Sequence, residues 1–222
     1  MRCLIFQPAG LGDVLFLQKI ATTLFLRGYE EILFPLLPGL LYIKDYVKTE
    51  GVSFLSTENL VEDGELEVFN FRDVNYQYPD DSVMKSKYKA FGVDYSDWSN
   101  FVSLERNLER EEALKEQLNI PDDYCLVNRN YGTPPNSSRK EFKVETQLPV
   151  VEMAVLEGYN LFDWCGIIAN ANEIYTVETA LNFLVDLLPM KATKLEQYSR
   201  HDPPSYFHVE GLFKADWNYN LI

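Results

Sequence analysis

The sequence predicts an α/β protein made of two Rossmann-like lobes, each with a mostly parallel sheet. Short apolar runs of strand length alternate with longer segments of helical periodicity in residues 1–120, and the alternation restarts after residue 121. Strands that alternate with helices form parallel sheets, because each helix carries the chain back to the end at which the previous strand began. The chain has 222 residues, and 46% of them are hydrophobic, enough for one large core or two smaller ones.

The first lobe is expected to span residues 1–120. Its predicted strands are short apolar or alternating runs, at 3–7, 31–34, 52–56 and 66–71. Its predicted helices carry apolar residues or charges at helical spacing, at 13–27, within 37–48, at 85–93 and at 107–118. Gly28 is the expected C-cap of the first helix, because glycine readily adopts the conformation that ends helices.

The second lobe is expected at 121–222, because Pro121 and the two aspartates after it break the preceding helix. Its predicted strands are at 124–132, 173–177 and 192–200, and its predicted helices are at 160–171 and 178–188. The run 148–155 fits either a strand or a helix. The loop 133–142 is rich in Pro, Ser and Asn and then becomes basic.

The composition excludes several kinds of partner. The formal net charge is −14, from 34 acidic and 20 basic residues, so the chain has no general attraction to nucleic acid or to an anionic membrane surface. No segment is long and apolar enough to span a membrane, and no signal peptide is evident. We therefore expect no nucleic-acid partner and no transmembrane segment.

The cysteines indicate a reducing compartment. The three cysteines lie far apart, in or next to apolar runs, at Cys3, Cys125 and Cys165. They are expected to be reduced and buried, which favours a cytoplasmic protein. No cluster of cysteines and histidines suggests a metal site, and neither His201 nor His208 has a partner that the sequence identifies.

A glycine-rich turn, QPAGLGD at 7–13, joins the first predicted strand to the first predicted helix. Such a turn can hold a phosphate. The dinucleotide-binding fingerprint would need a third glycine where this chain has Leu15, and an acid where the second strand ends in Phe34 and Pro35. The lysine of a P-loop is also missing. This argues against a nucleotide-dependent oxidoreductase, and it leaves Asp13 as either a helix cap or a reactive group.

Residues 161–189 combine a helix, a short strand, a tight turn and a second helix. This segment resembles the donor-binding segment of the heptosyltransferase-like glycosyltransferases (glycosyltransferase family 9, GT-B fold), which commonly carries a motif like V-D-T-G-L-S-H-L. Residues 177–184 read VETALNFL at that place. The turn with Gly10, Leu11 and Gly12 is similar to the family's first loop, usually G-x-L-G-D. The resemblance implies a compact, divergent member of the family.

The resemblance also implies a reaction, in which a sugar passes from a nucleotide-diphosphate donor to a hydroxyl of a glycan or other acceptor. The family's loop aspartate is the proposed catalytic base, and it maps onto Asp13. Glu178 would face sugar or ribose hydroxyls, and Thr179 with Ala180 would meet the donor phosphate at a helix start. The basic loop would supply further hydroxyls and cations for the diphosphate, from Ser137, Ser138, Arg139 and Lys140. No metal and no cofactor is expected.

Each of these roles has a structural alternative. Thr179 is also a suitable N-cap, Glu178 a suitable partner for a helix dipole, and the basic loop residues suit a solvated loop. Aromatic and basic residues that fit the acceptor side are equally suited to packing or to the surface, namely Tyr76, Tyr78, Lys85, Lys87 and Tyr88.

The departures from the family motif leave a second function open. Ala180, Asn182 and Phe183 stand where the motif has Gly, Ser and His, and Glu178 stands for the usual Asp. Loss of the histidine removes one possible phosphate contact. The alternative to an enzyme is therefore a non-catalytic module of the same fold that binds a sugar nucleotide or a glycan.

Overall fold

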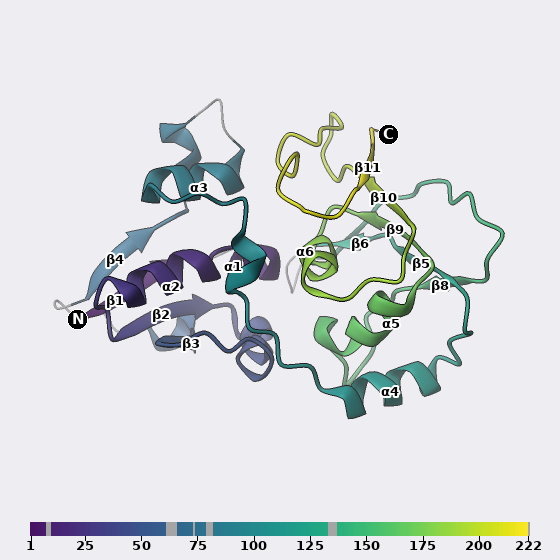
Figure 1. Ribbon diagram of the computed structural model, residues 1–222, viewed down its shortest axis with the longest axis horizontal. Coiled ribbons are helices and arrows are strands. Elements are labelled where there is room, and N and C mark those ends of the chain that lie inside the picture. The colour runs from purple at the N-terminus through teal and green to yellow at the C-terminus, as the bar shows by residue number, and fades with distance from the viewer. Residues whose placement is uncertain (8–9, 61–65, 73, 79–81, 133–136, 222) are drawn as a thin grey trace. The chain divides into compact units, whose positions relative to one another are not determined.

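The computed structural model describes residues 1–7, 10–60, 66–72, 74–78, 82–132 and 137–221. The chain divides into two compact units, unit 1 (Met1–Glu105) and unit 2 (Arg106–Ile222). Each unit has helices packed on its own parallel sheet (Figure 1). The predicted α/β class with mostly parallel sheets is therefore confirmed.

The described residues of unit 1 form a parallel sheet in the order β3–β2–β1–β4. The strands are β1 (Arg2–Phe6), β2 (Glu31–Leu36), β3 (Val52–Ser56) and β4 (Glu67–Asn70). From β1 the chain adds β2 and β3 on one side and then returns to place β4 on the other. The strand order thus reverses between β1 and β4, which is where open α/β sheets bind ligands, beyond the carboxyl ends of the strands.

The helix that follows β1 is broken into two. The sequence predicted one helix at 13–27, whereas the structure has α1 (Leu11–Phe16) and α2 (Gln18–Leu26), separated by Leu17. The apolar residues from Val14 through Leu24 are buried, whereas Leu26 at the end of α2 is exposed. Gly28 follows α2 with a φ of +94°, as expected of a glycine beyond a helix end.

An aromatic cluster packs the later part of unit 1 against α1. The remaining elements are 3-10 helices η1 (Pro38–Asp45), η2 (Thr57–Asn59), η3 (Val74–Gln77) and η4 (Trp98–Phe101), and helix α3 (Val83–Phe91). The Phe16 ring lies 4.6 Å from that of Tyr88 and 5.6 Å from that of Trp98, and both partners are fully buried. This packing places one face of α3 against α1.

The described residues of unit 2 form a second parallel sheet in the order β11–β10–β9–β5–β8. Its strands are β5 (Cys125–Asn128), β8 (Val150–Glu152), β9 (Glu173–Val177), β10 (Lys194–Tyr198) and β11 (Asn218–Asn220). The run 148–155 therefore contains a strand, and β11 was not predicted. The strand order reverses between β5 and β9, so the corresponding ligand position lies beyond their carboxyl ends.

The helices of unit 2 include one that the sequence assigned to the first lobe. They are α4 (Leu108–Gln117), the 3-10 helix η5 (Leu161–Trp164), α5 (Cys165–Asn170) and α6 (Ala180–Leu187). Helix α4 lies beside α5 (Figure 1), and the Arg110 guanidinium donates two hydrogen bonds of 2.8 Å to the fully buried carboxylate of Asp163. The division between the units therefore falls before α4, not at the predicted 120/121 boundary.

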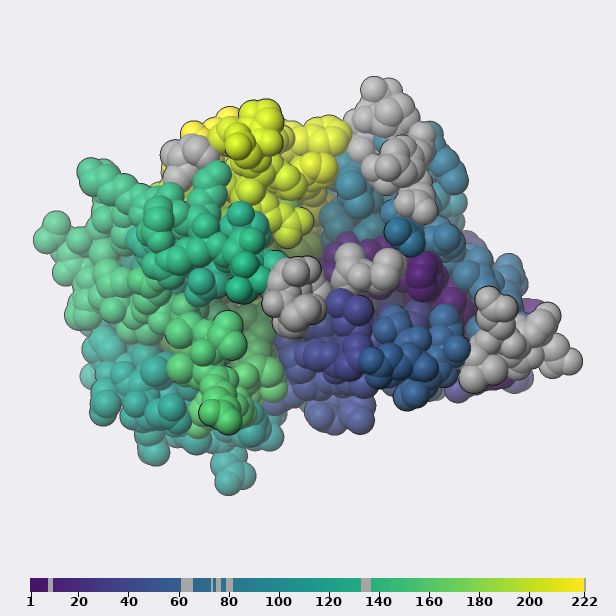
Figure 2. Space-filling view, turned by 180° about the vertical axis from the view of Figure 1, so that it is seen from behind, coloured from purple at the N-terminus to yellow at the C-terminus, as the bar shows by residue number. Residues whose placement is uncertain are grey.

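Three smaller features complete the fold. A short antiparallel ribbon joins β6 (Asn130–Tyr131) to β7 (Ser138–Arg139). The segment that follows β10, yellow in Figure 2, reaches the surface of unit 2. All three cysteines are buried and free, as predicted, and no helix among the described residues is long and apolar enough to cross a membrane.

Candidate functional site

Asp13 lies in the first turn of α1, the helix that follows β1. The strand order of the unit 1 sheet reverses beside β1. Its side chain does not cap the helix. The N-cap is Gly10, whose carbonyl oxygen accepts a hydrogen bond from the Asp13 N–H at 3.1 Å. The Asp13 carboxylate Oδ1 instead accepts a hydrogen bond from Nζ of Lys87 on α3. The capping interpretation of Asp13 therefore does not describe its contact.

Lys87 is the buried member of this pair. Its side chain is 1% exposed, against 19% for that of Asp13, and Nζ also lies 3.6 Å from Sδ of Met84. A buried ammonium group without a counterion lowers the stability of the fold by several kcal/mol. Asp13 therefore has a structural role as the counterion of Lys87, apart from any chemical role. Among the acceptor-side candidates Lys87 and Tyr88 are buried, and the side chain of Tyr76 lies outside the described residues.

The glycine turn before Asp13 is only partly described, because Pro8 and Ala9 lie outside the described residues. Gly10 has φ −77° and ψ 178°, a conformation open to any residue. Leu11 and Gly12 form the start of α1 and are buried. Leu11 is therefore a core residue and not an exposed loop side chain.

Thr179 is the N-cap of α6, as its structural alternative proposed. Its Oγ1 accepts a hydrogen bond from the Leu181 N–H at 3.3 Å, and its own N–H donates to Oδ1 of Asn182 at 2.9 Å. Thr179 N–H is thus engaged by Asn182. The Asn128 amide, at the end of β5, also approaches Thr179 Oγ1 at 3.4 Å, which joins β5 to the start of α6.

Two departures from the family motif have a structural explanation. Asn182 is fully buried and donates from Nδ2 to Oε1 of Gln197 at 2.8 Å, which ties α6 to β10. Phe183 is 6% exposed and packs edge-to-face on Phe213 with ring centroids 5.0 Å apart. Both side chains therefore belong to the core of unit 2. Ala180 is the first residue of α6.

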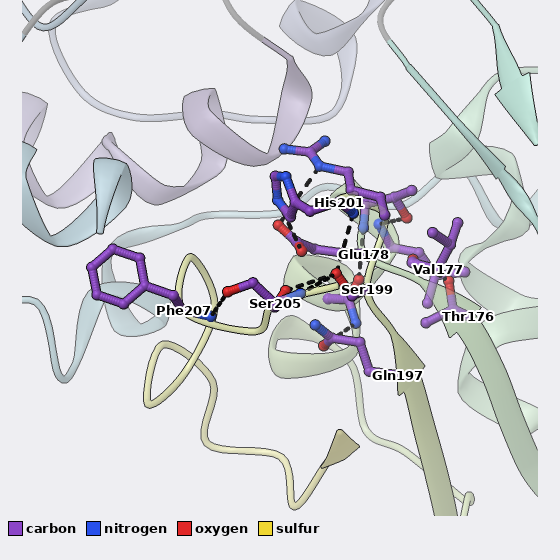
Figure 3. Close-up of polar contacts among 12 residues, drawn as sticks. Thr176, Val177, Glu178, Gln197, Ser199, His201, Ser205 and Phe207 are labelled. Carbon is purple, nitrogen blue, oxygen red and sulfur yellow. Dashed lines mark hydrogen bonds and ion pairs between the residues drawn. The ribbon is translucent and has the colours of Figure 1, made fainter. Parts of the chain in front are cut away.

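Glu178 is buried at the carboxyl end of β9, with 5% of its surface exposed (Figure 3). Its N–H donates to the Tyr198 carbonyl oxygen at 3.0 Å. The carboxylate faces two side chains from the end of β10: Oε1 lies 3.7 Å from Nε of Arg200, and Oε2 lies 3.5 Å from Nε2 of His201. Burial raises the pKa of Glu178, and the charges of Arg200 and His208 oppose that rise.

The two histidines meet beside Glu178. The rings of His201 and His208 have centroids 4.5 Å apart. Burial lowers the pKa of both, helped for His201 by the charges of Arg200 and Lys140. Neither histidine has a partner that can be identified from the sequence, because Glu178 and His201 meet only through the pairing of β9 with β10.

The residues of the basic loop differ in the contacts that their side chains already make. Arg139 is held by two carboxylates, since Nε lies 2.6 Å from Oε1 of Glu141 and Nη2 lies 2.6 Å from Oε1 of Glu152. These contacts raise the pKa of Arg139. Lys140 is close enough to His201 for its charge to act on the imidazole. Ser137 and Ser138 are exposed, and the neighbouring residues 133–136 lie outside the described ones.

The structure therefore groups Glu178, Arg200 and His201 and brings the charge of Lys140 to the same group. In the part of the chain that the structure describes, no group of three or more His, Cys, Asp or Glu side chains is arranged to hold a metal ion.

The comparisons with known proteins establish the fold. No family model matches the sequence, and no curated protein matches it. The chain is similar to the crystal structure of a glycosyl transferase of family 9 from Veillonella parvula, with a TM-score of 0.57 and 10% identity over 99% of this chain and 86% of that one. It is also similar to the iron-containing dodecameric glycosyltransferase TibC from enterotoxigenic E. coli, with a TM-score of 0.50 and 11% identity over 89% of this chain and 57% of that one. The protein thus has the Rossmann-like α/β fold of the family 9 glycosyl transferase from Veillonella parvula.

Proposed function

We propose that the protein is a metal-independent glycosyltransferase that moves a sugar from a nucleotide-diphosphate donor to a hydroxyl acceptor, with Asp13 as general base. The observation that carries the proposal is the pair formed by Asp13 and Lys87. Asp13 follows β1, beside which the strand order of the unit 1 sheet reverses. Lys87 fixes the carboxylate in place through one oxygen. The side chain of Asp13 keeps 19% of its surface exposed, so that a hydroxyl can approach it.

The reaction forms one bond and breaks one. The acceptor oxygen forms a bond to the anomeric carbon as its proton passes to Asp13, and the bond from that carbon to the diphosphate oxygen breaks. The electron pair leaves with the diphosphate, whose growing negative charge must be stabilised by nearby cations and donors. In unit 2 we assign this part to Lys140 and Arg200 and to the Thr179 hydroxyl. Arg139 contributes less, because two carboxylates already balance its charge.

The test compares two variants that differ only at the proposed base. Lys87→Met and Asp13→Asn/Lys87→Met both lack the buried ammonium group, so neither leaves it without a partner. Release of nucleoside diphosphate is followed with UDP-, GDP- and ADP-linked hexoses and a set of mono- and oligosaccharide acceptors. We expect turnover to be roughly 10²–10⁴-fold lower in the double variant, the usual contribution of a general base. Equal turnover in the two variants would exclude Asp13 as the base.

The second candidate is a module that binds a sugar nucleotide without transferring the sugar. The specific observation in its favour is the burial of Phe183 against Phe213, in the position where the family motif has a histidine. This candidate predicts sugar-nucleotide binding that can be measured by calorimetry, with no release of nucleoside diphosphate by the wild-type chain under any acceptor condition.

A further inference from the structure

Two buried polar atoms face one another beyond the carboxyl ends of β9 and β10 (Figure 3). They are Oε2 of Glu178 and Nε2 of His201, which lie 3.5 Å apart. Neither atom has a hydrogen-bond partner among the described residues, and 95% of the Glu178 surface is buried, since 5% is exposed. Polar atoms buried without partners are unfavourable in folded proteins and call for an explanation.

The surroundings hold His201 in place. Ser199 Oγ accepts hydrogen bonds from the His201 N–H at 3.2 Å and the Ser205 N–H at 2.9 Å, and it donates to the Ser205 carbonyl oxygen at 2.8 Å. Ser199 is itself buried, and its N–H donates to the Asn220 carbonyl oxygen on β11 at 3.2 Å. The His208 ring packs against that of His201. The pair of atoms is therefore part of an ordered turn anchored to the sheet.

The chemistry of the two atoms selects a hydroxyl group as their common partner. An ionised carboxylate only accepts hydrogen bonds, whereas a neutral imidazole can donate one from Nε2. A hydroxyl can donate to the first and accept from the second. A phosphate oxygen can do only the second, and it would be repelled by Glu178. At a separation of 3.5 Å, one oxygen can lie within hydrogen-bond reach of both atoms.

We propose that Glu178 and His201 together bind one hydroxyl of the donor sugar, with Glu178 accepting and His201 donating. This rests on the proposed function, because it assigns a role within the donor site. The charged groups around the pair suit such a role. Nε of Arg200 lies 3.7 Å from Oε1 of Glu178, and the charge of Lys140 acts on His201. Both cations can therefore serve to bind the diphosphate next to the sugar. Burial and these two cations lower the pKa of His201, which keeps the imidazole neutral near pH 7.

The test measures binding to the sugar separately from binding to the nucleotide. Calorimetry is run with UDP-glucose, GDP-mannose and ADP-glucose and with the matching UDP, GDP and ADP. His201→Phe keeps a ring that can pack on His208 and removes Nε2. For the sugar nucleotide that binds the wild type, we expect roughly 10-fold weaker binding to His201→Phe and unchanged binding of the matching nucleoside diphosphate. His201→Gln, whose amide can place an N–H near the same point, is expected to restore part of the lost affinity.

Deoxy analogues of the bound sugar nucleotide give an independent readout. The wild type should lose affinity for the analogue that lacks the recognised hydroxyl. His201→Phe should discriminate less between that analogue and the parent than the wild type does, because only the Glu178 carboxylate still binds the hydroxyl. Equal discrimination by the two proteins would exclude a contact from His201 to that hydroxyl.

Three results would overturn the inference. Unchanged sugar-nucleotide affinity in His201→Phe would exclude the contact. An equal loss for nucleoside diphosphate would place His201 on the phosphates. If the wild type binds no sugar nucleotide, the proposed function fails as well. Sugar-nucleotide binding that does not depend on His201, together with turnover that depends on Asp13, removes only this inference.

Discussion

Lys87 donates a hydrogen bond from Nζ to Oδ1 of Asp13, which lies 74 residues away in the sequence. The lysine side chain is almost completely buried, whereas the aspartate reaches the surface. The pair therefore has two separable roles, since it neutralises a buried charge and it fixes a carboxylate beside the end of β1. The first role bears on stability and the second on chemistry.

The stability role predicts a large effect for Asp13→Asn. Asparagine cannot neutralise Lys87, so the variant leaves a buried ammonium group without its counterion. We expect the free energy of unfolding to fall by about 3–5 kcal/mol, the usual result of removing one partner of a buried pair. Urea denaturation of Asp13→Asn, Lys87→Met and the double variant measures this. The double variant should be more stable than Asp13→Asn. A helix-capping role for Asp13 predicts instead almost no change in Asp13→Asn.

The cap of α6 predicts a graded series at Thr179. Thr179→Ala removes the acceptor for the Leu181 N–H and should lower the free energy of unfolding by about 1 kcal/mol, whereas Thr179→Ser retains the hydroxyl and should cost little. If the hydroxyl also contacts the donor phosphate, Thr179→Ala will weaken nucleoside diphosphate binding and Thr179→Ser will not. Equal stability of the alanine and serine variants in urea denaturation would argue against the cap.

The sequence predicted the strands well where burial alone decides them. The run EIYTV was predicted as a strand at 173–177, and β9 occupies the same residues, because a central strand of a parallel sheet is apolar on both faces. Strand β11 was missed because its residues, NYN, are polar. Its place depends on contacts with β10, such as the bond from Asn218 Nδ2 to Oε2 of Glu196. The pairing of β11 with β10 cannot be recognised from the pattern of residues within β11.

The candidate site also combines features that the local sequence indicates with features that depend on contacts between distant elements. The glycine-rich turn and the resemblance to the family's first loop singled out Asp13, and the resemblance to the family's donor motif singled out Glu178. Both lie at the carboxyl edges of their sheets. Their partners Lys87 and His201 were not assigned, because each pair forms only when separate elements pack together. The helix α4 went to the wrong side of the division for a similar reason, since its attachment depends on Arg110 and the distant Asp163.

The basic loop predicts different results for two neighbouring residues. Lys140→Ala should weaken nucleoside diphosphate binding by about 1–3 kcal/mol, the range for a charge-assisted contact. Arg139→Ala should weaken it less, because its guanidinium is bound to Glu141 and Glu152. Calorimetry on the two single variants compares them directly, with Lys143→Ala, in the same segment, as a control for loss of one positive charge. A larger effect at Arg139 than at Lys140 would contradict this assignment.

The histidine pair predicts how the stability of the protein depends on pH. The pKa of His201 and His208 is lowered from the ordinary value of 6.5, chiefly by burial, so the unfolded chain binds their protons more readily than the folded one. Their contribution to the free energy of unfolding is fully present above pH 6.5, the ordinary pKa. It is lost as the pH falls from 6.5 through the lower pKa values of the folded state.

Glu178 acts in the opposite sense. Burial raises its pKa above 4.5, so the folded state holds this proton more tightly, and the associated stability is lost as the pH rises above 4.5.

Free energies of unfolding at pH 5.5 and 7.5 are therefore compared for the wild type and for the His201→Phe/His208→Phe variant. We expect the gain in stability from pH 5.5 to 7.5 to be smaller in the variant, because it lacks the two groups that favour the higher pH. Measured from pH 4.5 upward, the Glu178→Gln variant should gain more stability than the wild type, since it no longer carries a carboxyl group whose ionisation opposes folding. An identical pH dependence in all three proteins would show that this group of side chains is solvated much as it is in the unfolded chain.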